Sequence, residues 1–332
     1  MPQSARKPEN GRTYRRGLAR DHTNPIHGNI PMKNCITQGL PVPEDLIGNL
    51  QESSDLKGKP GALKRRLKED GYLFLRGVID RDEVLAARAE IFERLANVGE
   101  IKQPSREGLF TGRSDRKETA GDLGAFWQSV CEGPALRQVT HGPQLRAVMA
   151  EVLGDPARPQ DYLFLRPGPV GRATPLHYDY PFFARGSDRI HTAWLALGDV
   201  PVTDGPLLVI EGSNHFMDLI EPATSVDYDS KDSPAVSVMD SPISLAQSRG
   251  TRLLTADFEP GDLAVFGMTT LHGTLDNHSS FGRIRLSCDI RFQPMADEID
   301  KRYFGPNPKG STGIGYGELN GAKPLTEPWH TR

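Results

Sequence analysis

The chain has 332 residues, enough to bury a sizeable core in one large domain or two small ones. Its net charge of -3 excludes a global basic field, and no stretch approaches the roughly 20 apolar residues that cross a bilayer, so we expect neither a nucleic-acid partner nor a membrane partner. Cys35, Cys131 and Cys288 form no CxxC pair, and the polar, basic N-terminus lacks the apolar segment of a secretory signal, so reduced thiols and a cytoplasmic location are predicted.

The first part of the chain predicts an extension followed by helices. Residues 1–58 are rich in Pro, Gly and Asn without periodicity, which indicates a segment draped over the fold or partly mobile. A helix is expected from near Ala62 to a stop at Gly71, followed by a strand in YLFLRGVI. Asp80 is a candidate N-cap for the next amphipathic helix, and a further helix is predicted from Leu136 to Leu153.

After Gly154 the pattern changes to short apolar or alternating runs separated by turn signals. This spacing is typical of an antiparallel sandwich or barrel. Helices followed by strands predict one α+β unit over residues 59–300, a jelly roll flanked by N-terminal helices, with a loop-rich tail over residues 301–332.

The segment TPLHYDYPFF, residues 174–183, holds the first candidate metal ligands. In a strand, residues two apart point to one face, so His177 and Asp179 are predicted to project together. An imidazole and a carboxylate are two parts of the facial triad of non-haem iron oxygenases. An HxD tripeptide alone is weak evidence, because such a His is more often structural and such an Asp is more often solvated.

A second segment supplies the third candidate ligand. In PGDLAVFGMTTLHG a strand follows a turn, and His272 lies near the end of that strand. His278 is a rival, but it lies in a DNHSS turn where a surface histidine is expected. His191 and His215 have no carboxylate at strand spacing and are interpreted as structural or pocket-lining.

The last predicted strand alternates strictly between two kinds of residue. Ile284, Leu286, Cys288, Ile290 and Phe292 share one face, and Arg283, Arg285, Ser287, Asp289 and Arg291 share the other. The polar face could simply meet solvent. The alternative is a barrel interior, where arginine holds a dicarboxylate through two parallel hydrogen bonds.

Linked motifs over roughly residues 60–295 resemble the phytanoyl-CoA dioxygenase-like family of iron(II)/2-oxoglutarate oxygenases. They are LKEDGYLFLRGVI, the HxD, WLALGDVPVTDGPLLVIEGSNH, PGDLAVF, and His272 with Arg283 eleven residues later. The resemblance implies a double-stranded β-helix (the cupin-like jelly roll) and iron on His177, Asp179 and His272. It also implies that Arg283 binds the 2-oxoglutarate carboxylate and that Thr274 assists, with Arg285 as the runner-up.

The chain departs from the family at two places. The family commonly reads GSH where residues 212–215 read GSNH, so one residue is inserted in that loop. A glutamine that often precedes the HxD is replaced by Ala173 or Thr174, which puts a secondary co-substrate or substrate contact in doubt.

The expected reaction is hydroxylation of an unactivated C–H bond of a small molecule, with consumption of 2-oxoglutarate and dioxygen and release of succinate and carbon dioxide. Halogenating relatives replace the ligand carboxylate with a small residue, so Asp179 favours hydroxylation; desaturation, epoxidation and epimerisation would use the same ligands. Two other classes stay open, namely a cupin-like metal-dependent isomerase or epimerase, which would not need Arg283, and a ligand-binding jelly roll without activity. Phe183 and Trp194 are candidate substrate contacts, although either could belong to the core. The sequence indicates no oligomeric state.

Overall fold

The computed structural model describes residues 34–183, 185–227 and 241–329. Most of the predicted N-terminal extension, residues 1–33, lies outside the described residues. Its remaining part, residues 34–58, contributes three short strands to the fold: β1 (Ile36–Thr37), β2 (Leu40–Pro41) and β3 (Ile47–Asn49).

The end of α1 (Pro60–Asp70) and the start of α2 (Arg81–Ala96) lie at residues that the sequence indicated. α1 starts with a proline in its first turn and ends at Gly71, whose φ of 82° is the left-handed conformation that glycine adopts readily. Asp80 caps α2 by accepting hydrogen bonds from the backbone N–H groups of Asp82 and Glu83. These helices and their neighbours are α1 (Pro60–Asp70), α2 (Arg81–Ala96), α3 (Arg116–Thr119), α4 (Leu123–Cys131), α5 (Pro134–His141) and α6 (Pro143–Leu153).

The helical stretch predicted around Leu136 to Leu153 is present, but it is divided into two helices, α5 and α6. Gly142 separates them in an extended conformation, with ψ at 172°. Pro143 follows it, and a proline disfavours the helical conformation of the residue before it and has no N–H to donate to the preceding turn.

Two sheets form the second half. In the larger sheet the order is β4-β10-β7-β12-β5, and β6 also pairs with β12; in the smaller sheet it is β11-β8-β9-β3. The strands not yet given are β4 (Tyr72–Leu75), β5 (Ala157–Pro159), β6 (Phe164–Gly168), β7 (His191–Ala196), β8 (Leu207–Ile210), β9 (Leu253–Thr255), β10 (Leu263–Gly267), β11 (His272–Thr274) and β12 (Arg285–Pro294). Short helices fill the connections: α7 (Tyr180–Phe183), α8 (Met217–Thr224) and α9 (Pro242–Arg249).

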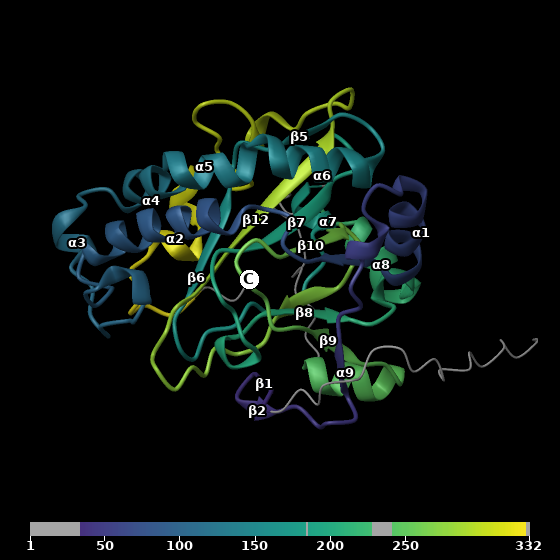
Figure 1. Ribbon diagram of the computed structural model, residues 1–332, viewed down its shortest axis with the longest axis horizontal. Coiled ribbons are helices and arrows are strands. Elements are labelled where there is room, and N and C mark those ends of the chain that lie inside the picture. Colours follow the sequence, from purple (N-terminus) through teal and green to yellow (C-terminus); the bar gives the residue numbers. More distant parts are fainter. Residues whose placement is uncertain (1–33, 184, 228–240, 330–332) are drawn as a thin grey trace, which may run out of the picture. The chain divides into compact units, whose positions relative to one another are not determined.

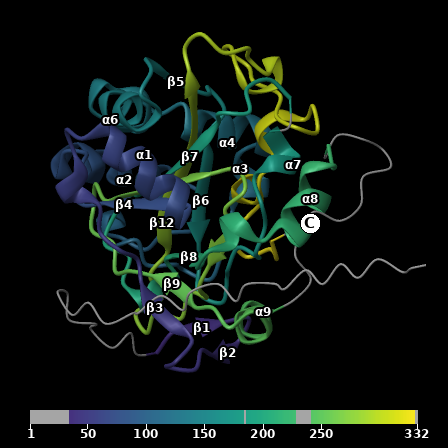
Figure 2. The same cartoon turned by 90° about the vertical axis from the view of Figure 1, so that its right-hand side faces the viewer.

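The two sheets share a hydrophobic core. One buried cluster contains residues of both, including Phe74, Trp194 and Phe266 from the larger sheet and Val209 and Leu254 from the smaller one. A second cluster joins the other face of the larger sheet to the N-terminal helices, and Figures 1 and 2 agree in placing α1, α2 and α6 on that side. The fold is therefore a helical layer on a two-sheet unit, in agreement with the predicted combination of helices and strands.

Strand β12 is buried along its whole length, on both faces. Its apolar face belongs to the cluster under the helices, and Arg285, Ser287, Asp289 and Arg291 point to the other side. The alternative in which this polar face meets solvent is therefore wrong. Burying several charged groups costs free energy unless they are paired with one another or bind a ligand. This buried polar face therefore indicates a binding site.

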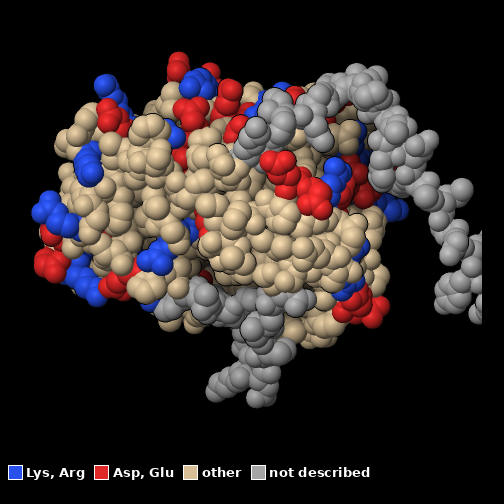
Figure 3. Space-filling model, turned by 90° about the horizontal axis from the view of Figure 1, so that it is seen from below, with Lys and Arg blue, Asp and Glu red and all other residues tan. Residues whose placement is uncertain are grey.

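The end of the chain packs on the domain through short turns rather than regular helices. The Tyr316 ring stacks on that of Tyr162 with centroids 4.6 Å apart, and Arg116 donates a hydrogen bond to the carbonyl of Gly321. On the face seen in Figure 3, lysine and arginine side chains are interspersed with aspartate and glutamate. Within the described ranges, no helix has the length and apolar character needed to span a bilayer.

Candidate active site

The backbone brings His177 and His272 side by side. His177 N–H donates to the His272 carbonyl at 2.9 Å and His272 N–H donates back at 3.2 Å, which forms an isolated antiparallel bridge. The HxD segment was expected in a strand, but only His177 pairs in this way, and Asp179 lies in a bend directly before α7. Two ligand candidates about 95 residues apart in sequence are thus held together by main-chain hydrogen bonds, which do not depend on a bound ion.

Hydrogen bonds fix the orientation of both imidazoles. Nδ1 of His177 lies 2.9 Å from the Pro175 carbonyl, and Nδ1 of His272 lies 2.9 Å from the Thr270 carbonyl. A carbonyl only accepts, so each Nδ1 carries the proton and each Nε2 keeps its lone pair. Burial, with the neighbouring His272, lowers the pKa of His177 to about 3, and burial also lowers the pKa of His272. Both rings are therefore neutral at pH 7, the state in which imidazole binds a metal.

Asp179 is the charged member of the group and is only 1% exposed. Arg291 donates to its two oxygens at 2.8 and 3.0 Å, and the Thr192 hydroxyl donates to Oδ2. Burial alone would raise the pKa of Asp179, but Arg291 and the two histidines hold it well below its ordinary value. The carboxylate is thus ionised, and its Oδ1 lies 3.7 Å from Nε2 of His177, too far for a hydrogen bond between them.

These three side chains suit a divalent transition metal. One atom from each of His177, Asp179 and His272 lies within 4.8 Å of the others, and no other such group of three occurs in the part of the chain that the structure describes. The spread is close to what bonds of roughly 2.0–2.2 Å to one ion allow. Two neutral imidazoles and one carboxylate are the donor set of the facial triad. The predicted ligands are therefore brought together, whereas the rival His278 donates a hydrogen bond from Nε2 to the Asn34 carbonyl at 2.7 Å.

Arg283 and Arg285, the two candidates for binding an acidic co-substrate, differ in burial and in hydrogen bonding. Arg283 donates to Asp204 at 2.6 Å, and its side chain is 29% exposed. Arg285 is fully buried, bonds Ser287 through Nη1, and has no hydrogen-bond partner for Nε and Nη2 among the described residues. Burial, with the nearby Arg166, lowers the pKa of Arg285 to about 10, so it stays charged at pH 7. The buried arginine with two free donor groups is therefore Arg285, which the sequence analysis ranked second to Arg283 as the residue that binds 2-oxoglutarate.

Thr274, the predicted assistant, is buried and accepts a hydrogen bond from the backbone N–H of Thr174 at 2.7 Å. This contact ties β11 to the segment that leads into the HxD. It places Thr274 beside the position where the family often has a glutamine.

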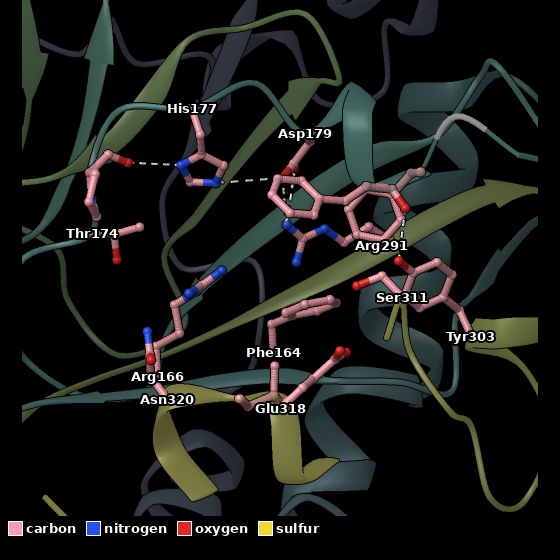
Figure 4. A pocket seen from close by; sticks show the side chains of 14 residues that line it. Phe164, Arg166, Thr174, His177, Asp179, Arg291, Tyr303, Ser311, Glu318 and Asn320 are labelled. Carbon is pink, nitrogen blue, oxygen red and sulfur yellow. Dashed lines mark hydrogen bonds and ion pairs between the residues drawn. The ribbon is translucent and has the colours of Figure 1, made fainter. Parts of the chain in front are cut away.

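A cavity of about 810 Å³, part of it open to solvent, lies against His177 and Asp179 (Figure 4). Phe183, a candidate substrate contact, lines it together with Phe182, and both lie in α7. Trp194 lies instead in the cluster between the sheets, 4.7 Å from the Phe258 ring, and is not among the residues that line this cavity.

Sequence reasoning missed much of the cavity wall. Arg166 from β6 and Tyr303, Ser311, Glu318 and Asn320 from the C-terminal segment line it. The basic residue within an apolar strand was a usable signal for Arg166. Nothing in the sequence of the C-terminal segment indicated that it would reach the metal ligands.

Comparisons with known proteins agree with this geometry. The family model for phytanoyl-CoA dioxygenase (PhyH) matches residues 67–285, more than half of the chain. The chain is 26% identical over 286 residues to a 1-deoxypentalenic acid 11-beta-hydroxylase of Streptomyces exfoliatus, covering 83% of this chain and 96% of that protein. It is 27% identical over 191 residues to phytanoyl-CoA dioxygenase domain-containing protein 1 of Mus musculus, covering 47% of this chain and 65% of that protein.

Among solved structures, the epimerase SnoN in complex with Fe3+, alpha ketoglutarate and nogalamycin RO is similar, with a TM-score of 0.49, 22% identity, and coverage of 74% of this chain and 88% of that one. EctD from S. alaskensis with 2-oxoglutarate and 5-hydroxyectoine also has a TM-score of 0.49, with 17% identity and coverage of 81% and 89%. On the family match, the chain belongs to the phytanoyl-CoA dioxygenase family of iron(II)- and 2-oxoglutarate-dependent oxygenases.

Proposed function

We propose that this chain hydroxylates an unactivated C–H bond of a small molecule, consuming 2-oxoglutarate and dioxygen and releasing succinate and carbon dioxide. The observation that carries the proposal is the donor set of His177, Asp179 and His272, two neutral imidazoles and one ionised carboxylate beside a cavity. In keeping with the family, we also infer that the two facing sheets form a double-stranded β-helix.

The three side chains would hold iron(II) through the Nε2 atoms of both histidines and a carboxylate oxygen of Asp179. When bound, the metal and the 2-oxo acid supply the oxidising chemistry. The protein orients these ligands before any ion arrives: Pro175 and Thr270 hold the rings, and Arg291 and Thr192 hold the carboxylate. The phenyl rings of Phe164, Phe182 and Phe183 exclude water from part of the cavity wall.

We infer that Arg285, rather than Arg283, binds the far carboxylate of 2-oxoglutarate. An arginine buried without an acidic partner is costly unless a ligand supplies one, and Arg285 has two donor groups free of described partners. Gly168 supports this assignment, because an added Cβ there would lie 3.0 Å from Nη2 and would crowd the guanidinium. Arg283 already has its carboxylate in Asp204.

Two observations support hydroxylation of a small molecule in particular. The ligand position held by a small residue in halogenating relatives is an aspartate here, Asp179, so the metal keeps its carboxylate. The similar bacterial protein carries the name of a hydroxylase of 1-deoxypentalenic acid, and 96% of its length is matched.

The test begins with metal and co-substrate, without a known substrate. The purified protein is expected to bind about one equivalent of iron(II) and, under anaerobic conditions with 2-oxoglutarate, to develop the visible charge-transfer band of an iron-bound 2-oxo acid. Asp179→Ala should lose iron and the band. Asp218→Ala, which removes a surface partner of Arg249, is the matched control and should keep both.

Titration with 2-oxoglutarate also shows whether Arg285 or Arg283 binds the co-substrate. Losing a charge-assisted pair costs roughly 1.5–3 kcal/mol, so Arg285→Leu should weaken 2-oxoglutarate binding about 10- to 150-fold while iron content stays unchanged. Arg283→Leu should have a small effect. The reverse pattern would return the role to Arg283. Absence of iron binding and of the band in the wild type would contradict the proposed function and favour a ligand-binding module.

A further inference from the structure

The interior beside the metal ligands holds an excess of positive charge. Arg285 and Arg291 are each 1% exposed, and Arg166 reaches the same region from β6. Facing these three guanidinium groups are two buried carboxylates, Asp179 and Asp289. Arg291 pairs with Asp179 and Arg166 pairs with Asp289, so Arg285 is the guanidinium without a carboxylate among these five side chains. Burying such a charge is unfavourable unless a ligand neutralises it. The side chain of Arg166 is 21% exposed.

The three arginines are not equivalent. Arg291 donates to Asp179 through Nη2 and lies over the rings of Phe164 and Phe183, 4.4 and 4.8 Å from their centroids, while its Nε and Nη1 have no hydrogen-bond partner among the described residues. Arg285 has the role proposed above toward the co-substrate. Arg166 pairs with Asp289 through Nε, so its two Nη groups are the donors left to account for.

Arg166 is held rigidly and points into the cavity. Its Nε donates to Asp289 at 2.6 Å, and neither Nη group makes a hydrogen bond to the described residues. Burial alone would lower the pKa of Arg166, but Asp289 raises it, so the charge is secure. Figure 4 shows the side chain projecting into the cavity between His177 and Phe164. A planar fork presented in this way suits a carboxylate.

The rest of the wall is mostly apolar. Phe164, Phe182, Phe183, Tyr303 and Leu319 line the cavity. The acidic residue of the wall, Glu318, is already engaged, since it accepts hydrogen bonds from the Tyr162 hydroxyl and from the backbone and hydroxyl of Thr312.

We propose that the substrate itself carries a carboxylate, which Arg166 binds, on an apolar skeleton that lies against the aromatic wall. This inference rests on the proposed function and adds the chemical class of the substrate and the residue that selects it. Arg166 would also orient the skeleton, because the carboxylate is anchored beside the metal ligands.

The test measures binding without turnover. The anaerobic protein loaded with iron(II) and 2-oxoglutarate is incubated with a pool of small carboxylic acids and their matched primary amides, such as 1-adamantanecarboxylate and 1-adamantanecarboxamide. Retained compounds are identified by mass spectrometry, and their affinities are measured by titration. The wild type is expected to retain acids over their amides, and Arg166→Leu to bind the retained acids roughly 10- to 150-fold more weakly with little change for amides.

Controls separate recognition from folding. Arg166→Leu leaves Asp289 with Arg291 as its remaining cation at 3.5 Å, so the double variant Arg166→Leu/Asp289→Asn removes the orphaned carboxylate. Arg166→Lys keeps the charge and should restore part of the acid affinity. Arg252→Leu breaks an arginine–glutamate pair on the surface and should leave acid binding unchanged.

Three results would overturn the proposal: equal retention of acids and amides by the wild type, no retained acid at all, or undiminished acid binding in both Arg166→Leu variants. If those variants lose the charge-transfer band of 2-oxoglutarate, Arg166 binds the co-substrate instead and the proposal also fails. The proposed function itself fails separately, through loss of iron or of the band in the wild type.

Discussion

Replacing Arg291 by glutamine tests whether Asp179 is built to share its charge with a metal. Arg291 and Asp179 form an ion pair in which each side chain is 1% exposed, and the donor–acceptor distances are 2.8 and 3.0 Å. Removing one partner of a buried pair typically costs about 3–5 kcal/mol, because the other charge is left without compensation. In Arg291→Gln, the hydrogen bond from Thr192 would remain on the carboxylate.

Binding of a metal ion should restore part of the stability that Arg291→Gln loses. In the variant, a divalent ion neutralises the charge of Asp179 that the substitution leaves unpaired. The ion is also no longer repelled by the guanidinium of Arg291. The variant should therefore gain more stability from metal binding than the wild type does. With an unfolding entropy of about 2.1 cal/mol/K per residue, each kcal/mol shifts Tm by roughly 1.5 °C in a chain of this length. We expect Arg291→Gln to lower Tm by roughly 5–7 °C with a chelator present, and by less than half of that with saturating Mn(II), used as a redox-stable stand-in.

Arg116→Gln is the matched control. Arg116 pairs with Glu100, both side chains are fully buried, and neither residue belongs to the metal-ligand group. Its loss in Tm should be the same with chelator and with Mn(II). Equal losses for Arg291→Gln under the two conditions would refute the reasoning, because they would mean that the ion does not compensate Asp179.

Three further outcomes are expected. Gly273→Ala should abolish iron binding, because the new Cβ would lie 2.6 Å from the Thr174 carbonyl and push the two ligand segments apart; Gly267→Ala, with its nearest contact at 3.9 Å, should bind iron normally. Burial and two neighbouring arginines lower the pKa of His141 to about 3, so its contribution to stability is present above pH 6.5 and is lost as the pH falls toward 3. In His141→Gln, the slope of the free energy of unfolding against pH should be smaller over that range than in the wild type, by up to about 1.4 kcal/mol per pH unit. Equal slopes in the two proteins would contradict this. Burial, with a nearby carboxylate, raises the pKa of Cys35 to about 11, so a thiol reagent at pH 8 should label it slowly until urea unfolds the chain, and fast labelling of the native protein would count against this burial.

Local patterns in the sequence determined the boundaries of the early helices and the identity of the candidate metal ligands. A glycine that adopts a left-handed conformation ends α1 at Gly71, and a capping aspartate begins α2 after Asp80, because both effects act within one turn of helix. Alternation along β12 separated its polar face from its apolar face, since side chains in a strand alternate wherever the strand lies.

Tertiary structure decided what those faces and loops do. Arg283 and Arg285 share a face in the sequence, and only the approach of Asp204, 79 residues away, distinguishes the paired arginine from the buried one. The C-terminal segment shows neither helical nor strand periodicity in its sequence, because its turns depend on long-range contacts such as the stacking of Tyr316 on Tyr162. Spacing and periodicity record interactions between near neighbours in the chain, whereas the pairing of charges and the walls of a cavity depend on residues that only folding brings together.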